Sequence, residues 1–175
     1  MENLSVTALL SEEHQYILKV ISAVEKECAI AEDQTIIHEA FWLSIIDFVQ
    51  NYADRFHHAK EEDILFKEMC RDDVPLPCNP VQQMLYEHEQ GRKFVRQLIA
   101  ALENKNLADM LDNARNYAML LRSHIHKEDN ILYPMADQAL SQDVQDKMLA
   151  AFKQVEAEKF PADLKEKYQN FANNL

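Results

Sequence analysis

Two stretches of the sequence share a pattern of residue types that could bind metal. Residues 57–66 and residues 124–133 both read His-x-x-Lys-Glu-acid-x-Ile-Leu-aromatic. Each stretch places a His and a Glu four residues apart, which on a helix is the same face one turn on. A further histidine, His14 in the first half of the chain and His88 in the second, precedes each stretch. The chain therefore reads as an internal repeat whose halves each offer a lone His and a His-x-x-x-Glu.

Side chains of this kind point to a two-metal centre if they converge. Four imidazoles and two carboxylates exceed what a single tetrahedral zinc ion needs. They suit two ions, each held by two imidazoles, with both carboxylates and an oxide or hydroxide as bridges and one position left open for a small ligand. This mixed ligation suits two ions of iron (Fe) or manganese, with zinc possible. The candidate metal ligands are His14, His57, Glu61, His88, His124 and Glu128.

Long amphipathic helices must position these residues. Apolar residues recur every three or four positions through four segments, the period of a helix with one buried face. The candidate ligands fall on those faces, where an unpaired carboxylate is costly. Breaks between these helices are expected near residues 32–35, 72–80 and 104–106. We therefore predict an all-α fold, an antiparallel up-down four-helix bundle with short loops.

Spacing along the expected helices bears on whether the ligands meet. His88 lies 17 residues before the expected turn and His124 lies 19 residues after it, which gives an offset of ~3 Å in level. In the first half, His14 lies 19 residues before a turn near residue 33 and His57 lies 24 residues after it. That offset is ~7 Å, so convergence is better predicted for the second half.

A shorter helical extension is expected after the bundle. Ser141 is placed to cap a helix over about residues 142–159, and a last turn or two is expected within residues 163–170. We expect residues 1–136 to form the bundle and residues 137–175 to form a C-terminal helical extension packed on the same domain.

Composition and charge exclude several function classes. The 175 residues carry 18 basic and 30 acidic side chains, a net charge of −12, whereas nucleic-acid binding needs a basic face. One glycine cannot form a phosphate-binding loop. No apolar run approaches a membrane span, and the first residues do not resemble a signal peptide. We expect a cytoplasmic protein with no nucleic-acid or membrane partner, in which Cys70 and Cys78 are ordinary thiols or, alternatively, a redox pair.

With these motifs the sequence resembles the hemerythrin-like (HHE cation-binding) domain family. The resemblance covers about residues 5–136, and residues 87–92 also look like the third helix of that family. It implies a four-helix bundle with a non-haem di-iron centre. The oxygen-carrying hemerythrins use five histidines, two of them four residues apart on the third helix, whereas here Arg92 follows His88 at that distance. The resemblance therefore points to the branch linked with iron sensing, nitric oxide or peroxide handling, and iron–sulfur cluster repair.

Several polar residues beside the motifs are expected to lie at the protein surface and not among the metal ligands. His58 and Glu62, also four residues apart, are expected on a solvated neighbouring face, and the alternatives are a second candidate ligand pair or an outer role in the site. His126 is expected at the surface. Glu13 and Glu87 are expected to be exposed, although each could accept a hydrogen bond within the site.

Gly91 lies one turn after His88 on the inward face of its helix. A glycine within a helix costs about 1 kcal/mol relative to alanine, so its place calls for a reason. It either leaves space for a bound ligand or an entry path, or it allows close helix packing, and both interpretations stay open. Tyr117 and Leu121 are expected to line a pocket near His124.

Two functions of different classes follow from such a site. The first is a di-iron protein that binds or reacts with a small diatomic or peroxide ligand, namely dioxygen, nitric oxide or peroxide. The alternative is an iron- or redox-sensing regulatory module without turnover, because metal supplies folding free energy where ligands converge only in the folded state. Enzymatic turnover and the identity of a protein partner are left open. A purely structural bundle conflicts with imidazoles and carboxylates on core faces.

Overall fold

The computed structural model describes residues 5–76 and 80–175, and across these residues the fold is helical without any strand. This confirms the predicted all-α class. None of the described helices is long and apolar enough to cross a membrane. The helical elements, α-helices and π-helices (η), are α1 (Val6–Gln34), α2 (Glu39–Phe48), η1 (Val49–His58), η2 (Glu61–Leu65), α3 (Phe66–Met69), α4 (Val81–Glu103), α5 (Leu107–Lys127), η3 (Glu128–Leu132), α6 (Tyr133–Ala139), α7 (Gln142–Lys159) and α8 (Leu164–Asn173).

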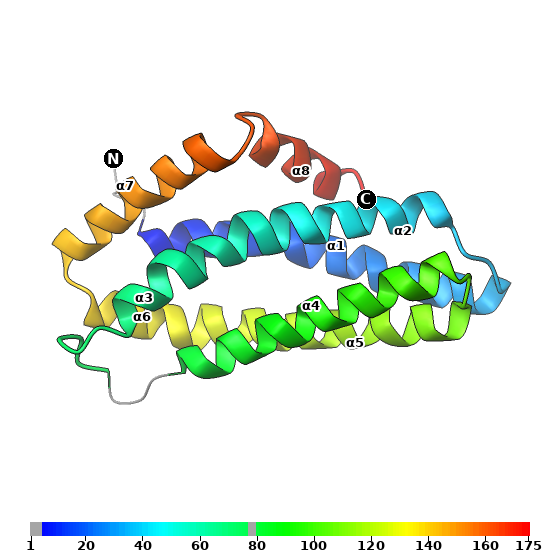
Figure 1. The fold of residues 1–175 in the computed structure, drawn as a ribbon, viewed down its shortest axis with the longest axis horizontal. Coiled ribbons are helices and arrows are strands. Elements are labelled where there is room, and N and C mark those ends of the chain that lie inside the picture. Colours follow the sequence, from blue (N-terminus) through cyan, green and yellow to red (C-terminus); the bar gives the residue numbers. More distant parts are fainter. Residues whose placement is uncertain (1–4, 77–79) are drawn as a thin grey trace.

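Four long helical segments lie side by side along the long axis of the molecule (Figure 1). The first is α1, the second runs from α2 through η1 and η2 into α3, the third is α4, and the fourth runs from α5 through η3 into α6. Helix α5 packs against both α1 and α4. The breaks fall close to the predicted ones, so helical periodicity located the segments.

The first turn comes slightly later than expected. Helix α1 continues to Gln34, and Thr35 ends it in the left-handed conformation with a φ of 56° while its N–H bonds to the carbonyl of Ala31. Since α2 begins only at Glu39, the turn is centred between residues 36 and 37 rather than near 33. The expected ~7 Å offset between the two histidines of this half thereby falls to ~3 Å.

Three parts of the second and fourth segments, namely η1, η2 and η3, are π-helical. In a π-helix each N–H bonds five residues back, and such turns are frequent at functional sites. The sequence contains a signal of this widening, because inward residues advance by four at Val49, Ala53, His57 and Glu61, which exceeds the 3.6-residue turn of an α-helix. The α-helical interpretation of this stretch was therefore wrong in detail.

Helices α7 and α8 form the C-terminal extension and lie over α1 and the second segment (Figure 1). Helix α7 has the predicted bounds, and α8 is longer than the expected turn or two. Phe152 and Met148 of α7, and Tyr168 and Ala172 of α8, are buried in the apolar core. The extension therefore contributes core residues at two places.

A polar layer divides the apolar core into two clusters. One cluster is centred on residues such as Ile17, Trp42 and Tyr52, and the other contains Leu10 and Met84. On each long segment the candidate ligands lie at or next to the boundary between the two clusters. This layer is where the repeat places its imidazoles and carboxylates.

Candidate metal centre

The structure brings the six predicted ligands together in the polar layer. The Nε2 atoms of His14 and His57 lie 2.9 Å apart, as do those of His88 and His124. Ligand atoms gather into two groups of four in which all atoms lie within 4.8 Å of one another. The two groups, all buried, are His14, His57, Glu61 and Glu128, and His58, Glu61, His88 and His124.

A glutamate orients the first histidine of each motif. The Nδ1–H of His57 donates to Glu13 at 2.9 Å, and that of His124 donates to Glu87 at 2.9 Å. Glu13 is 0% exposed and Glu87 is 6% exposed, so the expectation that both are exposed was wrong. Each glutamate contacts a histidine on another helical segment, distant from it in sequence.

The lysine of each motif holds the same glutamate. Lys60 donates to Glu13 and Lys127 donates to Glu87. Burial works against ionisation of Glu87, but bonds from His124, Lys127 and Gln83 bring its pKa down to about 2. Burial of Glu13 is more complete and raises its pKa despite Lys60. The lysine common to both copies of the repeat thus serves the carboxylate that orients the motif histidine.

The acidic residue that follows each motif glutamate orients the lone histidine of the other half. His14 Nδ1–H donates to Asp129 at 2.8 Å, and His88 Nδ1–H donates to Glu62 at 2.7 Å. Glu62 is therefore part of the site rather than of a solvated face. With Nδ1 occupied in all four rings, a neutral imidazole presents the lone pair of Nε2 to the centre, the arrangement that carboxylate partners impose on metal-binding histidines.

The two motif glutamates bring buried oxygens that have no hydrogen-bond partner among the described residues. These are Oε2 of Glu61 and both oxygens of Glu128. Glu128 lies 3.1 Å from Nε2 of His124 and 3.3 Å from Nε2 of His14. Glu61 Oε2 lies 3.5 Å and 3.7 Å from Nε2 of His88 and His57. Buried carboxylates without a partner are costly, and a cation facing them and the imidazole lone pairs would satisfy this donor set.

The ionisation of these groups follows from their crowding. Burial lowers the pKa of His14, but Asp129 and Glu128 outweigh it and raise the pKa to about 9. Burial likewise opposes protonation of His124, yet Glu128 raises its pKa to about 10. Burial and then the charge of Glu128 raise the pKa of Glu61. A metal cation that binds here would displace the protons held by these imidazoles.

His58 is a member of the site that sequence reasoning placed on a solvated face. It is 7% exposed, its ring stacks on His88 with centroids 3.8 Å apart, and its Nδ1 lies 3.3 Å from Asp54. A π-turn holds more residues than an α-turn, so neighbouring residues diverge less around the axis, and both His57 and His58 reach the centre. The physical cause of the error is therefore the π-helical conformation of η1.

Tyr133 was also missed. Its hydroxyl donates to Glu61 Oε1 at 2.5 Å, and its ring stacks parallel to His14 with centroids 5.5 Å apart. Aligning the two copies of the repeat could have found it, because Phe66 occupies the equivalent position. The same comparison pairs His58 with Ile125. Where one copy is polar and the other apolar, the site is asymmetric.

A partly open cavity of about 160 Å³ reaches the half of the centre that contains His88 and His124. Tyr117 and Leu121 line it as expected, together with Gly91. A Cβ atom at Gly91 would lie 3.6 Å from the ring of Tyr117, an ordinary contact. Close packing therefore does not demand a glycine, and the geometry favours the interpretation that Gly91 keeps the cavity open.

Arg92 lies on the outer side of this cavity. It donates to Asp54 at 2.9 Å and to Glu62 at 2.6 Å. Since Asp54 contacts His58 and Glu62 contacts His88, Arg92 holds the partners of two imidazoles. The residue found where another histidine occurs in oxygen-carrying hemerythrins thus supports the site from outside.

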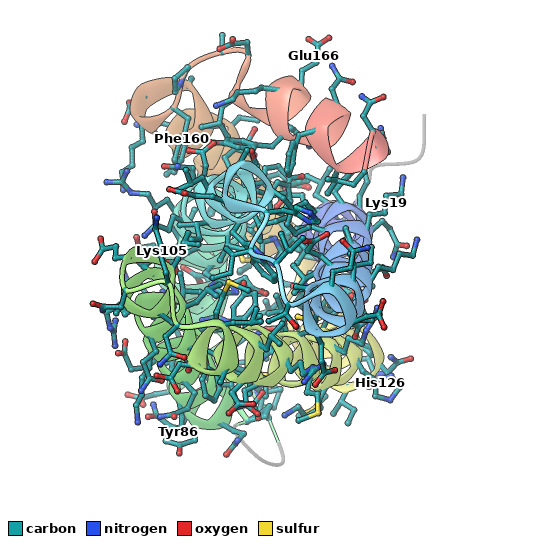
Figure 2. The ribbon with its side chains drawn as sticks, turned by 90° about the vertical axis from the view of Figure 1, so that its right-hand side faces the viewer. Lys19, Tyr86, Lys105, His126, Phe160 and Glu166 are labelled. Atoms are coloured by element: carbon teal, nitrogen blue, oxygen red, sulfur yellow. The ribbon has the colours of Figure 1, made fainter. Side chains whose placement is uncertain are left out.

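Two further predictions concern His126 and the cysteines Cys70 and Cys78. His126 is exposed and is labelled on the outer side of the bundle (Figure 2). Cys70 is exposed, and Cys78 lies outside the described residues. The assignment of this pair as ordinary thiols or a redox pair therefore stays a prediction.

Comparison with known proteins supports the resemblance seen in the sequence. Residues 5–136 match the family model described as the hemerythrin HHE cation binding domain. Searches of curated proteins and of solved structures found no match. The matched region contains all the candidate ligands and ends before α7 and α8. The chain belongs to the hemerythrin HHE cation-binding domain family.

Proposed function

We propose that this protein holds two iron ions and binds or reacts with a small oxidant, namely dioxygen, peroxide or nitric oxide. The observation that carries the proposal is the donor set. Four Nε2 atoms, each on a ring fixed through Nδ1, surround three buried carboxylate oxygens that have no hydrogen-bond partner within residues 5–76 and 80–175. Imidazole and carboxylate together suit iron, and manganese or zinc are the alternatives that elemental analysis would reveal.

The distances suggest how the donors would be shared. His14 and His57 would hold one ion, and His88 and His124 the other, since each pair is 2.9 Å apart at Nε2. Glu61 and Glu128 would serve both ions, because each approaches imidazoles of both halves. An antiparallel four-helix arrangement of residues 1–136, with the extension on the same domain, is the architecture we propose for this sharing.

The surroundings of the two pairs differ, which supports reaction at one of them. The cavity reaches the His88 and His124 pair, and its walls there include the apolar side chains of Val95 and Leu121. Bound iron would supply one-electron redox chemistry and a Lewis-acidic position for a small ligand. These apolar walls favour a small molecule of low polarity over water. His58, with its ring against His88, lies beside the place where such a molecule would arrive.

Iron sensing without turnover is the second candidate. A specific observation favours it, namely that the C-terminal extension contacts a residue that orients a ligand histidine. Glu13 accepts from His57, and Lys165 of α8 lies 3.9 Å from Glu13. Metal loading could therefore change how the extension packs, and turnover would not be needed for that response.

The test is metal content together with reactivity. The purified full chain is reconstituted with iron(II) without oxygen, and iron per chain is measured alongside the absorption spectrum. We expect two irons in the wild type and in the control Glu103→Gln, an exposed glutamate on α4, and one or none in Glu61→Gln and Glu128→Gln. A wild type that stays empty, or variants that load fully, would refute the two-iron centre.

Reactivity then separates the two candidates. The reduced protein is mixed in turn with dioxygen, peroxide and nitric oxide, and its spectrum is followed. A spectral change with any of them supports the oxidant proposal. Two bound irons that are inert to all three would leave iron sensing as the function.

A further inference from the structure

The C-terminal extension lies outside the region that matches the family, and it contacts residues that orient a candidate ligand. Lys60 is only 1% exposed, and its ammonium group donates to Glu13 and, at 2.8 Å, to Glu156 of α7. Lys165 of α8 lies 3.9 Å from the same Glu13. Helix α8 therefore approaches the carboxylate that holds Nδ1 of His57 directly, and α7 approaches it through Lys60.

The surroundings of Lys60 make its partners necessary. Its ammonium lies 3.8 Å from the ring centroid of Phe56 and 5.6 Å from that of Phe152 on α7. A buried ammonium is expensive unless it is paired, and only two carboxylates, Glu13 and Glu156, form ion pairs with it among the described residues. Charges thus alternate from Glu156 through Lys60 to Glu13, and loss of one member changes the position of the next.

The second half of the repeat offers an internal comparison. Lys127 pairs with Glu87 as Lys60 pairs with Glu13, but the Lys127 side chain is 32% exposed. Within the described parts of the chain, neither Lys127 nor Glu87 forms an ion pair with residues 137–175. The extension therefore acts on one half of an otherwise matched pair of networks.

We propose that Glu156 is a positioning residue for the metal position held by His14 and His57, and that the α7–α8 extension docks more firmly when metal is bound there. The proposal rests on the two-metal function above and adds an outer element to it. The proposed coupling between the extension and the metal position runs from Glu156 through Lys60 and Glu13 to His57.

The physical reason is the strength of one hydrogen bond. A metal on Nε2 makes the Nδ1–H of His57 a stronger donor to Glu13, as carboxylate partners of metal-bound histidines show. A fixed Glu13 fixes Lys60, and Lys60 holds Glu156. Linkage makes the effect reciprocal, so a docked extension must favour metal by the same factor by which metal favours docking.

The experiment compares Glu156→Gln with Glu158→Gln in the full chain. Glu158 lies two residues on in α7 and is exposed, so it controls for loss of charge on the same helix. Iron(II) affinity is measured without oxygen by competition with a chelator. We expect Glu156→Gln to weaken one of the two ions by about 10-fold, the lower end of what partners of metal ligands contribute. The other ion, and both ions in Glu158→Gln, should bind as in the wild type.

Hydrogen exchange of the α7 amides provides the second readout. Iron should slow exchange over residues 142–159 in the wild type, and Glu156→Gln should reduce that difference. A substitution that only loosened the helix would speed exchange equally with and without iron.

The possible failures are distinguishable. A wild type that binds no iron refutes the proposed function and this inference with it. If the wild type binds two irons, this inference alone is overturned by either of two results: exchange of α7 in the wild type that does not respond to iron, or iron affinities of Glu156→Gln equal to those of the wild type.

Discussion

The His, Lys and acidic residues that the two copies of the repeat share make matching contacts in the structure. In the second copy, His124 presents Nε2 to the centre while Glu87 holds its Nδ1, and Lys127 holds Glu87 in turn. Glu128 brings oxygens that have no hydrogen-bond partner in the part of the chain that the structure describes. Asp129 reaches across to the lone histidine of the first half. The repeat is therefore a ligand set together with the groups that orient it.

Glu87→Gln tests this arrangement at a residue that is not itself a candidate ligand. The amide removes the charge that faces His124 and Lys127, so the ring is held less firmly. We expect iron(II) binding to weaken by about 10- to 100-fold in a chelator competition. The control Glu103→Gln, at the exposed end of the same helix, should bind as the wild type does. Equal affinities for both variants would contradict an orienting role for Glu87.

Among the elements, the π-helical segments and α4 decide the shape of the site. η1 carries both His57 and His58, and its wide turn lets neighbouring residues approach the centre together. Helix α4 contributes His88 and, one turn later, Gly91, whose missing side chain borders the cavity. The cavity therefore depends on a residue that weakens the helix it belongs to.

Gly91→Ala tests separately the stability of the fold and the access of a small ligand through the cavity. Alanine favours the helix by about 1 kcal/mol, and its Cβ would make an ordinary contact with Tyr117. We expect denaturant unfolding to show a gain in the free energy of unfolding of up to about 1 kcal/mol. We also expect nitric oxide to bind the reduced iron protein more slowly in stopped-flow absorption, because the cavity narrows. A destabilised variant with unchanged binding kinetics would favour the close-packing interpretation instead.

For the whole molecule, stability depends on the polar layer that divides the core. The layer contains imidazoles whose charge depends on neighbouring carboxylates, with the pKa of His14 raised to about 9 and that of His124 to about 10. A raised pKa in the folded state stabilises the fold below the ordinary value of about 6.5. That contribution is lost as pH rises through the folded value.

The metal-free protein should therefore lose stability between pH 7 and pH 10. Urea unfolding of the metal-free protein at these two pH values measures the loss. The iron-loaded protein is the control, because bound metal takes the place of the protons on these imidazoles. We expect the iron-loaded protein to lose less stability than the metal-free protein between the two pH values. A metal-free protein equally stable at both pH values, or the same loss in both forms, would show that these imidazoles do not carry the effect.

The sequence by itself determined the helical class, the approximate segments and the six candidate ligands. Helical periodicity is a local property, and His-x-x-x-Glu places two side chains on one face whatever surrounds the helix. The internal repeat then required the two halves to match. None of these features depends on which helix packs opposite, and for that reason residue types and their spacing are enough to predict them.

Only the tertiary structure decided what surrounds those ligands. Burial of Glu13 and Glu87 depends on the helix that packs over each of them, and no pattern within their own helices reports it. His58 reaches the centre because η1 is π-helical and because its ring stacks on His88 of α4, a contact that spacing along its own helix does not report. The contact between Glu156 and Lys60 joins residues 96 positions apart. Such contacts arise from how helices assemble, and spacing along one helix does not encode them.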